Sequence, residues 1–145
     1  LMFLSYHHVA DKPAAAREIL RVLKPGGRLI LRNTFKDRIP NHWWRGYFPR
    51  SHDVEVAMFP TEAETRELFE AAGFRTVASV QMEIPFEGDI EALVAKLKLR
   101  AVSVFEHMTE EELDEGFARI DADLAKGAIV ERPTTGDFIV FEAPR

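Results

Sequence analysis

Residues 14–34 constrain the fold of this chain more than any other stretch, because they join a helix, a forced stop and an apolar strand. Asp11 is a suitable N-cap for the helix, and Pro25-Gly26 supplies the fixed φ and the positive φ of a type II turn. The helix is therefore predicted to end before Pro25. Its apolar side chains recur at i, i+3, i+4 and i+7 and share one face: Ala16, Ile19, Leu20 and Leu23.

The segment after this turn is predicted to be a strand that is covered on both faces. Residues 28–34 run apolar through Leu29, Ile30 and Leu31 without polar alternation, and residues 1–6 have the same character. Continuous apolar runs are typical of parallel strands with helices on both sides. Two such strands joined by a short helix predict an open α/β sheet. Taken alone, the Lys-Pro-Gly-Gly run is also explained as a good helix stop.

The rest of the chain alternates helices and strands. A Thr-x-x-Glu capping box opens a helix that Gly73 ends, and residues 74–84 follow as a strand with one apolar face. A pair of amphipathic helices is expected within residues 88–127. A turn over residues 133–136 then leads into a buried final strand over residues 137–143.

Composition narrows the class of protein. The 145 residues, 46% of them hydrophobic, can bury the core of a single domain, residues 1–145. The absence of cysteine excludes a disulfide framework, and no apolar run approaches the ~20 residues that span a bilayer. We therefore expect a soluble, cytoplasmic protein without a membrane partner.

Charge is distributed unevenly along the chain. Residues 1–50 carry a balance of +7 and residues 51–145 a balance of −12, which gives the net charge of −5. The basic first third is either a surface that favours an anionic ligand or ordinary solvated helix and loop. No arginine-rich patch with interleaved aromatic residues is present, so a nucleic-acid partner is not expected.

A family resemblance rests on the run RVLKPGG at residues 21–27, together with His7-His8 before it and the strand at residues 29–33 after it. This stretch resembles the second half of class I S-adenosylmethionine-dependent methyltransferases, in particular the small-molecule, type 11-like group. The sequence TEAETRELFEAAGF at residues 61–74 is similar to the penultimate helix of that family.

The resemblance implies a fold and a function. The fold is the C-terminal half of a Rossmann-like α/β domain, with a partly parallel sheet in the order 4-5-7-6, an antiparallel last strand and a helical insert over residues 88–127. The function is methyl transfer from S-adenosylmethionine to a small molecule.

The first half of that fold has no counterpart in the sequence. The eight glycines nowhere form the G-x-G loop that holds the cofactor at a helix N-terminus. We therefore expect a fragment that binds S-adenosylmethionine weakly or not at all and is inactive as an isolated chain. The alternative is a non-catalytic remnant that binds a ligand or another subunit. The apolar strand at residues 1–6 predicts a homo-oligomer formed through that strand.

Candidate cofactor and catalytic residues follow the first strand. Open α/β sheets bind ligands at the carboxyl ends of their strands. By resemblance, this loop runs beside the methionine end of the cofactor, which makes Ser5, Tyr6 and His7 the cofactor-binding candidates. His7 or His8 could serve as a general base, or could be a structural residue that bonds the next helix. A metal site that combines them with His42 has no recognised spacing, and none is predicted.

Candidate substrate residues come from two places. Residues 35–60 show neither helical nor strand periodicity, and long irregular segments are commonly lids or binding loops. Alternatively, the rings of this loop merely pin it onto the sheet. Two polar residues at the end of the second strand are expected to point into the same cleft. The full set of substrate candidates is Arg32, Asn33, Trp43, Trp44 and Tyr47.

Overall fold

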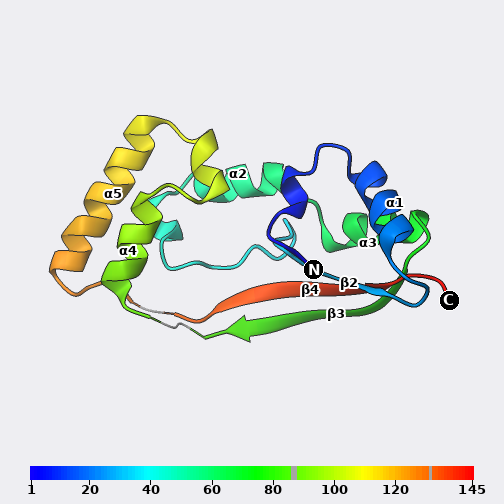
Figure 1. Cartoon of the computed structure of the whole chain (residues 1–145). Coiled ribbons are helices and arrows are strands. Elements are labelled where there is room, and N and C mark those ends of the chain that lie inside the picture. Colours follow the sequence, from blue (N-terminus) through cyan, green and yellow to red (C-terminus); the bar gives the residue numbers. More distant parts are fainter. Residues whose placement is uncertain (86–87, 131) are drawn as a thin grey trace.

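The computed structural model describes residues 1–85, 88–130 and 132–145. Strands and helices follow one another along the chain (Figure 1), and short 3-10 turns, here called η, separate several of them. In chain order the elements are β1 (Met2–Phe3), η1 (Tyr6–His8), α1 (Lys12–Val22), β2 (Arg28–Asn33), η2 (Arg45–Tyr47), α2 (Ser51–Met58), α3 (Glu62–Ala71), β3 (Arg75–Ile84), α4 (Ile90–Lys98), η3 (Ser103–His107), α5 (Glu110–Ala125) and β4 (Thr134–Glu142).

The four strands form one open sheet in the order β1-β2-β4-β3. β1 and β2 are parallel, whereas β4 lies between β2 and β3 and is antiparallel to both. In the family numbering, β1, β2, β3 and β4 are the fourth, fifth, sixth and seventh strands. The observed order is then 4-5-7-6, with an antiparallel last strand. The predicted fold class is confirmed.

The turn between α1 and β2 is built as its sequence predicts. Asp11 accepts a hydrogen bond from the Ala14 amide at 2.8 Å and caps α1. Gly26 takes a φ of 70°, a conformation that favours glycine, and the Gly27 amide donates to the Lys24 carbonyl at 2.7 Å. This turn lets the chain reverse from α1 directly into the middle of the sheet.

Two hydrophobic cores hold the chain. The first lies between the sheet and the helices α1 and α3, with Leu31 and Phe141 of the sheet fully buried beneath Ala16 and Phe69. The second joins the loop after β2 to α4, η3 and α5, which lie beyond one end of the strands (Figure 1). Its buried members are Trp44, Phe48, Val54, Val94, Leu97, Val104, Phe105, Leu113 and Ile120. None of the helices in the described residues has the length and apolar character needed to cross a bilayer.

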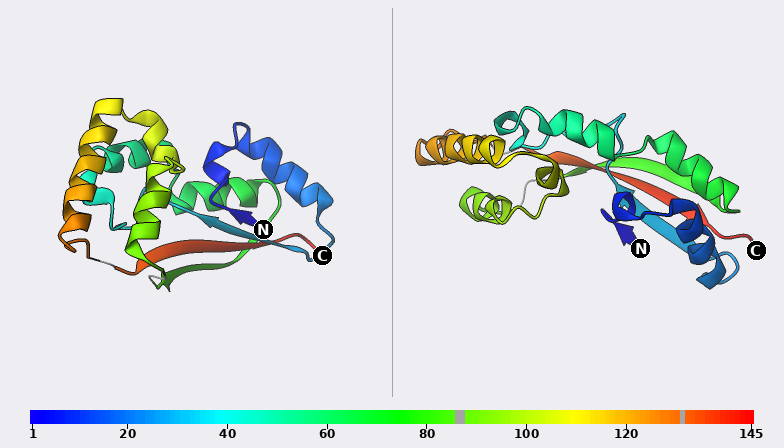
Figure 2. Two further views of the ribbon diagram at one scale, coloured as in Figure 1. Left: turned by 60° about the vertical axis from the view of Figure 1, so that its left-hand side comes forward. Right: turned by 90° about the horizontal axis from the view of Figure 1, so that it is seen from above.

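The prediction that β2 is covered on both faces is wrong. Burial alternates along β2, and Ile30 is 37% exposed while Leu31 is fully buried. The physical reason is that α1 and α3 lie on the same side of the sheet, and the described residues place no helix on the other side (Figures 1 and 2). The apolar face of β3 points to this open side as well, where Val80 and Met82 are 45% and 54% exposed.

Two segments predicted to be irregular are regular. The loop over residues 35–60 contains η2 and the helix α2, and the predicted turn over residues 133–136 is largely part of β4, which begins at Thr134. The helical period of α2 is hidden in the sequence because its buried face includes the polar residues Ser51 and Glu55. β4 begins as early as Thr134 because this residue still pairs with Ile84, the last residue of β3.

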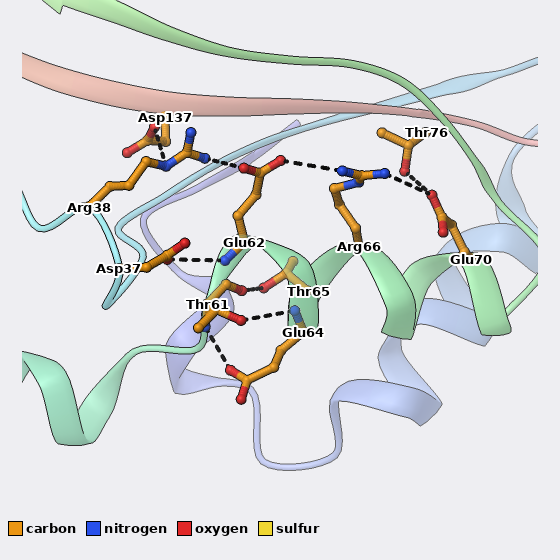
Figure 3. A network of polar contacts seen from close by, with 10 residues as sticks. All are labelled: Asp37, Arg38, Thr61, Glu62, Glu64, Thr65, Arg66, Glu70, Thr76 and Asp137. Carbon is orange, nitrogen blue, oxygen red and sulfur yellow. Dashed lines mark hydrogen bonds and ion pairs between the residues drawn. The ribbon is translucent and has the colours of Figure 1, made fainter.

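A polar network fixes the loop that leaves β2 (Figure 3). Arg38 reaches Glu62 at the start of α3 at 2.5 Å and Asp137 of β4 at 3.4 Å. Asp137 is only 1% exposed, and its burial raises the pKa of its carboxyl group. Asp37 accepts from the Glu62 amide at 3.3 Å. The network therefore holds the loop against both α3 and the sheet before the chain turns toward the second core.

Candidate functional site

A cavity of about 370 Å³ lies where β1 and β2 end, within the size range of small-molecule sites. The segments that follow these strands, beside the first core, contribute His7, His8 and Thr34. Trp44 of the second core and Ser103 of η3 also line the cavity. The cavity is therefore formed between the two cores, at the carboxyl edge of the parallel strands.

The structure brings both catalytic candidates to this cavity. His7 is half-buried, and its Nε2 lies 3.3 Å from the Ser103 Oγ of η3, so its partner is not the backbone of α1. Its ring meets Phe59 edge to face, with centroids 4.9 Å apart. Burial, and then the neighbouring charge of His8, lowers the pKa of His7. His7 is therefore neutral near pH 7 and retains a ring nitrogen that can accept a proton.

The three residues predicted to bind the cofactor, Ser5, Tyr6 and His7, do not all face the cavity. Tyr6 is 2% exposed and packs in the first core, with its ring centroid 5.7 Å from that of Phe69. Burial raises the pKa of its phenol. Ser5 is exposed and is not part of the cavity lining, whereas His7 is. Of these three, only His7 presents its side chain to the cavity.

The prediction that Arg32 and Asn33 point into one cleft is wrong, because consecutive strand residues face opposite sides of a sheet. The Arg32 guanidinium lies over the Phe138 ring at 5.7 Å, on the open side. Asn33 is 2% exposed on the helix-covered side and donates to the Thr34 carbonyl at 2.8 Å. Neither residue lines the cavity; Thr34 does.

The aromatic candidates also take different positions. Trp44 is 7% exposed in the second core, and its ring both stacks on His42 at 5.5 Å and lines the cavity. Trp43 lines smaller hollows beside it. Tyr47 donates its hydroxyl hydrogen to Asp123 of α5 at 2.9 Å, away from the cavity. The rings therefore pack mainly against η3 and α5 rather than pinning the loop onto the sheet.

Glu55, which lines the cavity from α2, is not among the residues predicted from the sequence. Glu55 is 5% exposed and accepts a hydrogen bond from Arg45 Nη2 at 2.5 Å. Burial raises the pKa of Glu55 to about 7, against the opposing effect of Arg45. The available signal was the spacing of Ser51, Val54 and Glu55, which is that of a helix face with polar residues on its buried side.

A second histidine of the cavity is held neutral. Burial lowers the pKa of His42 to about 4, and the positive charges of Arg45 and Arg32 act in the same direction. Within the described residues, no group of three or more His, Asp or Glu side chains is placed to hold a metal ion. The titratable groups of the lining thus include the neutral imidazole of His42 and the Glu55 carboxyl group.

An open, partly parallel sheet with a cavity at the carboxyl ends of its parallel strands is an α/β fold in which that edge is the usual place for ligands. The family model described as methyltransferase domain matches residues 1–79, more than half of the chain. The chain belongs to this family of methyltransferase domains.

Solved structures share the fold. A protein from Anabaena variabilis, named as a methyltransferase from an antibiotic biosynthesis pathway, has a TM-score of 0.75 at 18% identity, over 97% of this chain and 64% of its own. A protein named as a methyltransferase from Bacillus halodurans has a TM-score of 0.52 at 18% identity, over 98% and 62%. The [4+2]-cyclase SpnF has a TM-score of 0.51 at 16% identity, over 99% and 49%. The chain thus spans less than two thirds of the length of each. No curated protein matches the chain in sequence.

Proposed function

We propose that this chain takes part in methyl transfer from S-adenosylmethionine to a small molecule. The observation that supports the proposal most is the cavity at the ends of β1 and β2 in a chain of the methyltransferase family. The cofactor supplies a methyl group bound to a positively charged sulfur. The contribution of the protein to such a reaction is mainly to position the two reactants and to accept a proton.

The described residues fit only part of the cofactor. Leu4, His7 and His8 form the cavity wall after β1, where the family resemblance expects the methionine end. No glycine among the described residues lines the cavity, so no bare backbone is available there for close approach to the rest of the molecule. We therefore propose weak binding by the isolated chain.

His7 and His8 remain the proposed proton acceptors near the transferred methyl group. His7 is positioned by Ser103 and by the Phe59 ring, whereas His8 is exposed at the mouth of the cavity. Trp44 is the one predicted substrate residue that also lines this cavity, and it supplies an apolar wall. A small acceptor held between η1 and Trp44 would lie within reach of either imidazole.

Amide NMR spectra recorded during titration with S-adenosylhomocysteine test the proposal. We expect shifts confined to residues 4–8 and the facing cavity wall, with a dissociation constant near ~1 mM, about 4 kcal/mol of binding free energy. His8→Ala should weaken binding, and His107→Ala, which changes an exposed histidine outside the cavity, should not. Unchanged amide positions around the cavity at several millimolar ligand would contradict the proposal.

A second candidate function is subunit interaction without catalysis, and the open side of the sheet favours it. Phe3 on one edge strand and Val80 and Met82 on the other are 48%, 45% and 54% exposed there, and exposed apolar surface is typical of interaction sites. We propose a homo-oligomer formed through this side.

A further inference from the structure

The negative charge of the Glu55 carboxylate, in the wall of the cavity, is only partly balanced by nearby positive charge. Among the described residues, its ion-pair partner is Arg45 alone, at 2.5 Å. Arg45 does not interact with Glu55 alone, because its Nη1 also lies 3.1 Å from His52 Nδ1. Glu55 itself is 5% exposed, so little water is available to solvate its negative charge. A carboxylate in this position is stabilised further by a second cation.

Three other groups of the cavity lining do not supply that cation. His42 is neutral at pH 7, and burial disfavours the charged form of His7 as well. Arg100 reaches the cavity but pairs with Glu110 of α5 at 2.8 Å and lies 3.9 Å from Asp114. Glu106 adds a second carboxylate to the lining. The lining therefore holds two carboxylates, Glu55 and Glu106, while its arginine is already paired outside the cavity.

The walls beside Glu55 suit the apolar body of an organic cation. Trp44 and Phe59 line the same cavity. Aromatic faces attract ammonium groups, and more strongly where water is excluded. The volume of about 370 Å³ accommodates a molecule with one ring and a short side chain.

We infer that the small molecule that occupies this cavity carries an amine, which binds as an ammonium ion against Glu55 and transfers a proton to it. The inference deepens the proposed function and rests on it. When the N–H bond breaks, its electron pair stays on the nitrogen and the proton bonds to a carboxylate oxygen of Glu55. The neutral amine then has the lone pair that a methyl acceptor requires.

The pKa of Glu55, about 7, agrees with this role, because such a carboxyl group exchanges protons near neutral pH. Binding of an ammonium ion requires the ionised carboxylate and should weaken as the pH falls below 7. The charged and titratable groups that surround Glu55 are Arg45, His52, His7, His8, His42, Arg100 and Glu106.

The test is an NMR titration with benzylamine and with benzyl alcohol, which have the same ring but differ in charge. At pH 8 we expect benzylamine to bind about tenfold more tightly, the effect of one ion pair of roughly 1.4 kcal/mol. The preference should disappear at pH 5.5 and in Glu55→Gln. Glu91→Gln, which removes an exposed carboxylate on α4, is the matched control and should keep it.

Equal affinity of the two probes at pH 8, binding of neither, or an amine preference that survives Glu55→Gln would each overturn the inference. Should Glu55→Gln fail to fold, the pH dependence in the unmodified chain decides, with benzyl alcohol as the pH-independent reference. No methyl donor is present in this experiment. Its failure would therefore leave the S-adenosylhomocysteine titration as a separate test of methyl transfer.

Discussion

Gly116 of α5 should not tolerate alanine, although alanine is the better helix former. In the middle of a helix, Gly→Ala ordinarily stabilises a protein by about 1 kcal/mol. A Cβ at position 116 would, however, clash with Cε1 of the Phe48 ring. The sign of the effect depends on whether Phe48 can move.

The surroundings of Phe48 indicate that it cannot. The ring is fully buried, with the rings of Phe105, Phe117 and Trp44 at centroid distances of 4.7, 5.2 and 6.2 Å. Relief of the clash requires a shift of roughly 1 Å in a close-packed core, and overpacking of this kind costs about 1–3 kcal/mol. After the gain in helix propensity is subtracted, Gly116→Ala should lower the free energy of unfolding by roughly 1–2 kcal/mol.

Urea unfolding separates the gain in helix propensity from the cost of the clash. The variants are Gly116→Ala, Gly46→Ala, Phe48→Leu, and Phe48→Leu combined with Gly116→Ala. Gly46→Ala is the control, because a Cβ there meets no atom within 4 Å, and it should change the stability by less than about 0.5 kcal/mol. Phe48→Leu with Gly116→Ala should be more stable than the sum of the two single variants, because the smaller side chain relieves the clash. A Gly116→Ala protein at least as stable as the unmodified chain would refute the reasoning.

Three further predictions concern the site and the open sheet. Since Trp44 lies in the second core and Trp43 beside it, Trp44→Ala should cost about 3–5 kcal/mol in urea melts and Trp43→Ala clearly less; equal losses would contradict this. The raised pKa of Glu55 contributes stability that is complete below its ordinary value of 4.5 and is lost as the pH rises through about 7. The unfolding free energy of the unmodified chain relative to Glu55→Gln should therefore fall by on the order of 3 kcal/mol between pH 4.5 and pH 8, and a flat difference would exclude the shift. Light scattering at micromolar concentration should show self-association that Val80→Lys with Met82→Lys reduces, and a monomeric unmodified chain would argue against the oligomer.

Local sequence chemistry predicted most helix ends correctly. The cap at Asp11 and the capping box that begins at Thr61 are present with the expected hydrogen bonds. These signals operate within four residues, so they do not depend on the rest of the fold. Strand order is different, because it depends on contacts distant in sequence. Here it followed from family resemblance rather than from periodicity.

Burial was the weak point of the sequence analysis. The alternation in β3 correctly marked a strand, but the pattern cannot tell which face a helix covers, and the apolar face is the open one. In α2 the buried positions include a serine and a glutamate, so hydrophobic periodicity failed. Glu55 became visible as a site residue only once α2 was placed against the cavity. His7 and His8 could be located earlier, because the end of a parallel strand marks the ligand-binding edge of a sheet.

The position of the cavity between two separate cores bears on how the chain opens. Hydrogen exchange commonly reveals cooperative units that unfold below the global free energy, and each core here is a candidate unit. Among the described side chains that line the cavity, His7 and Ser103 form the direct hydrogen bond across the boundary between the two cores. A ligand that touches both walls would add its binding free energy to the cost of separating the units. Occupancy of the cavity should then slow amide exchange in α5 and in α1 together, although no residue of either helix lines the cavity.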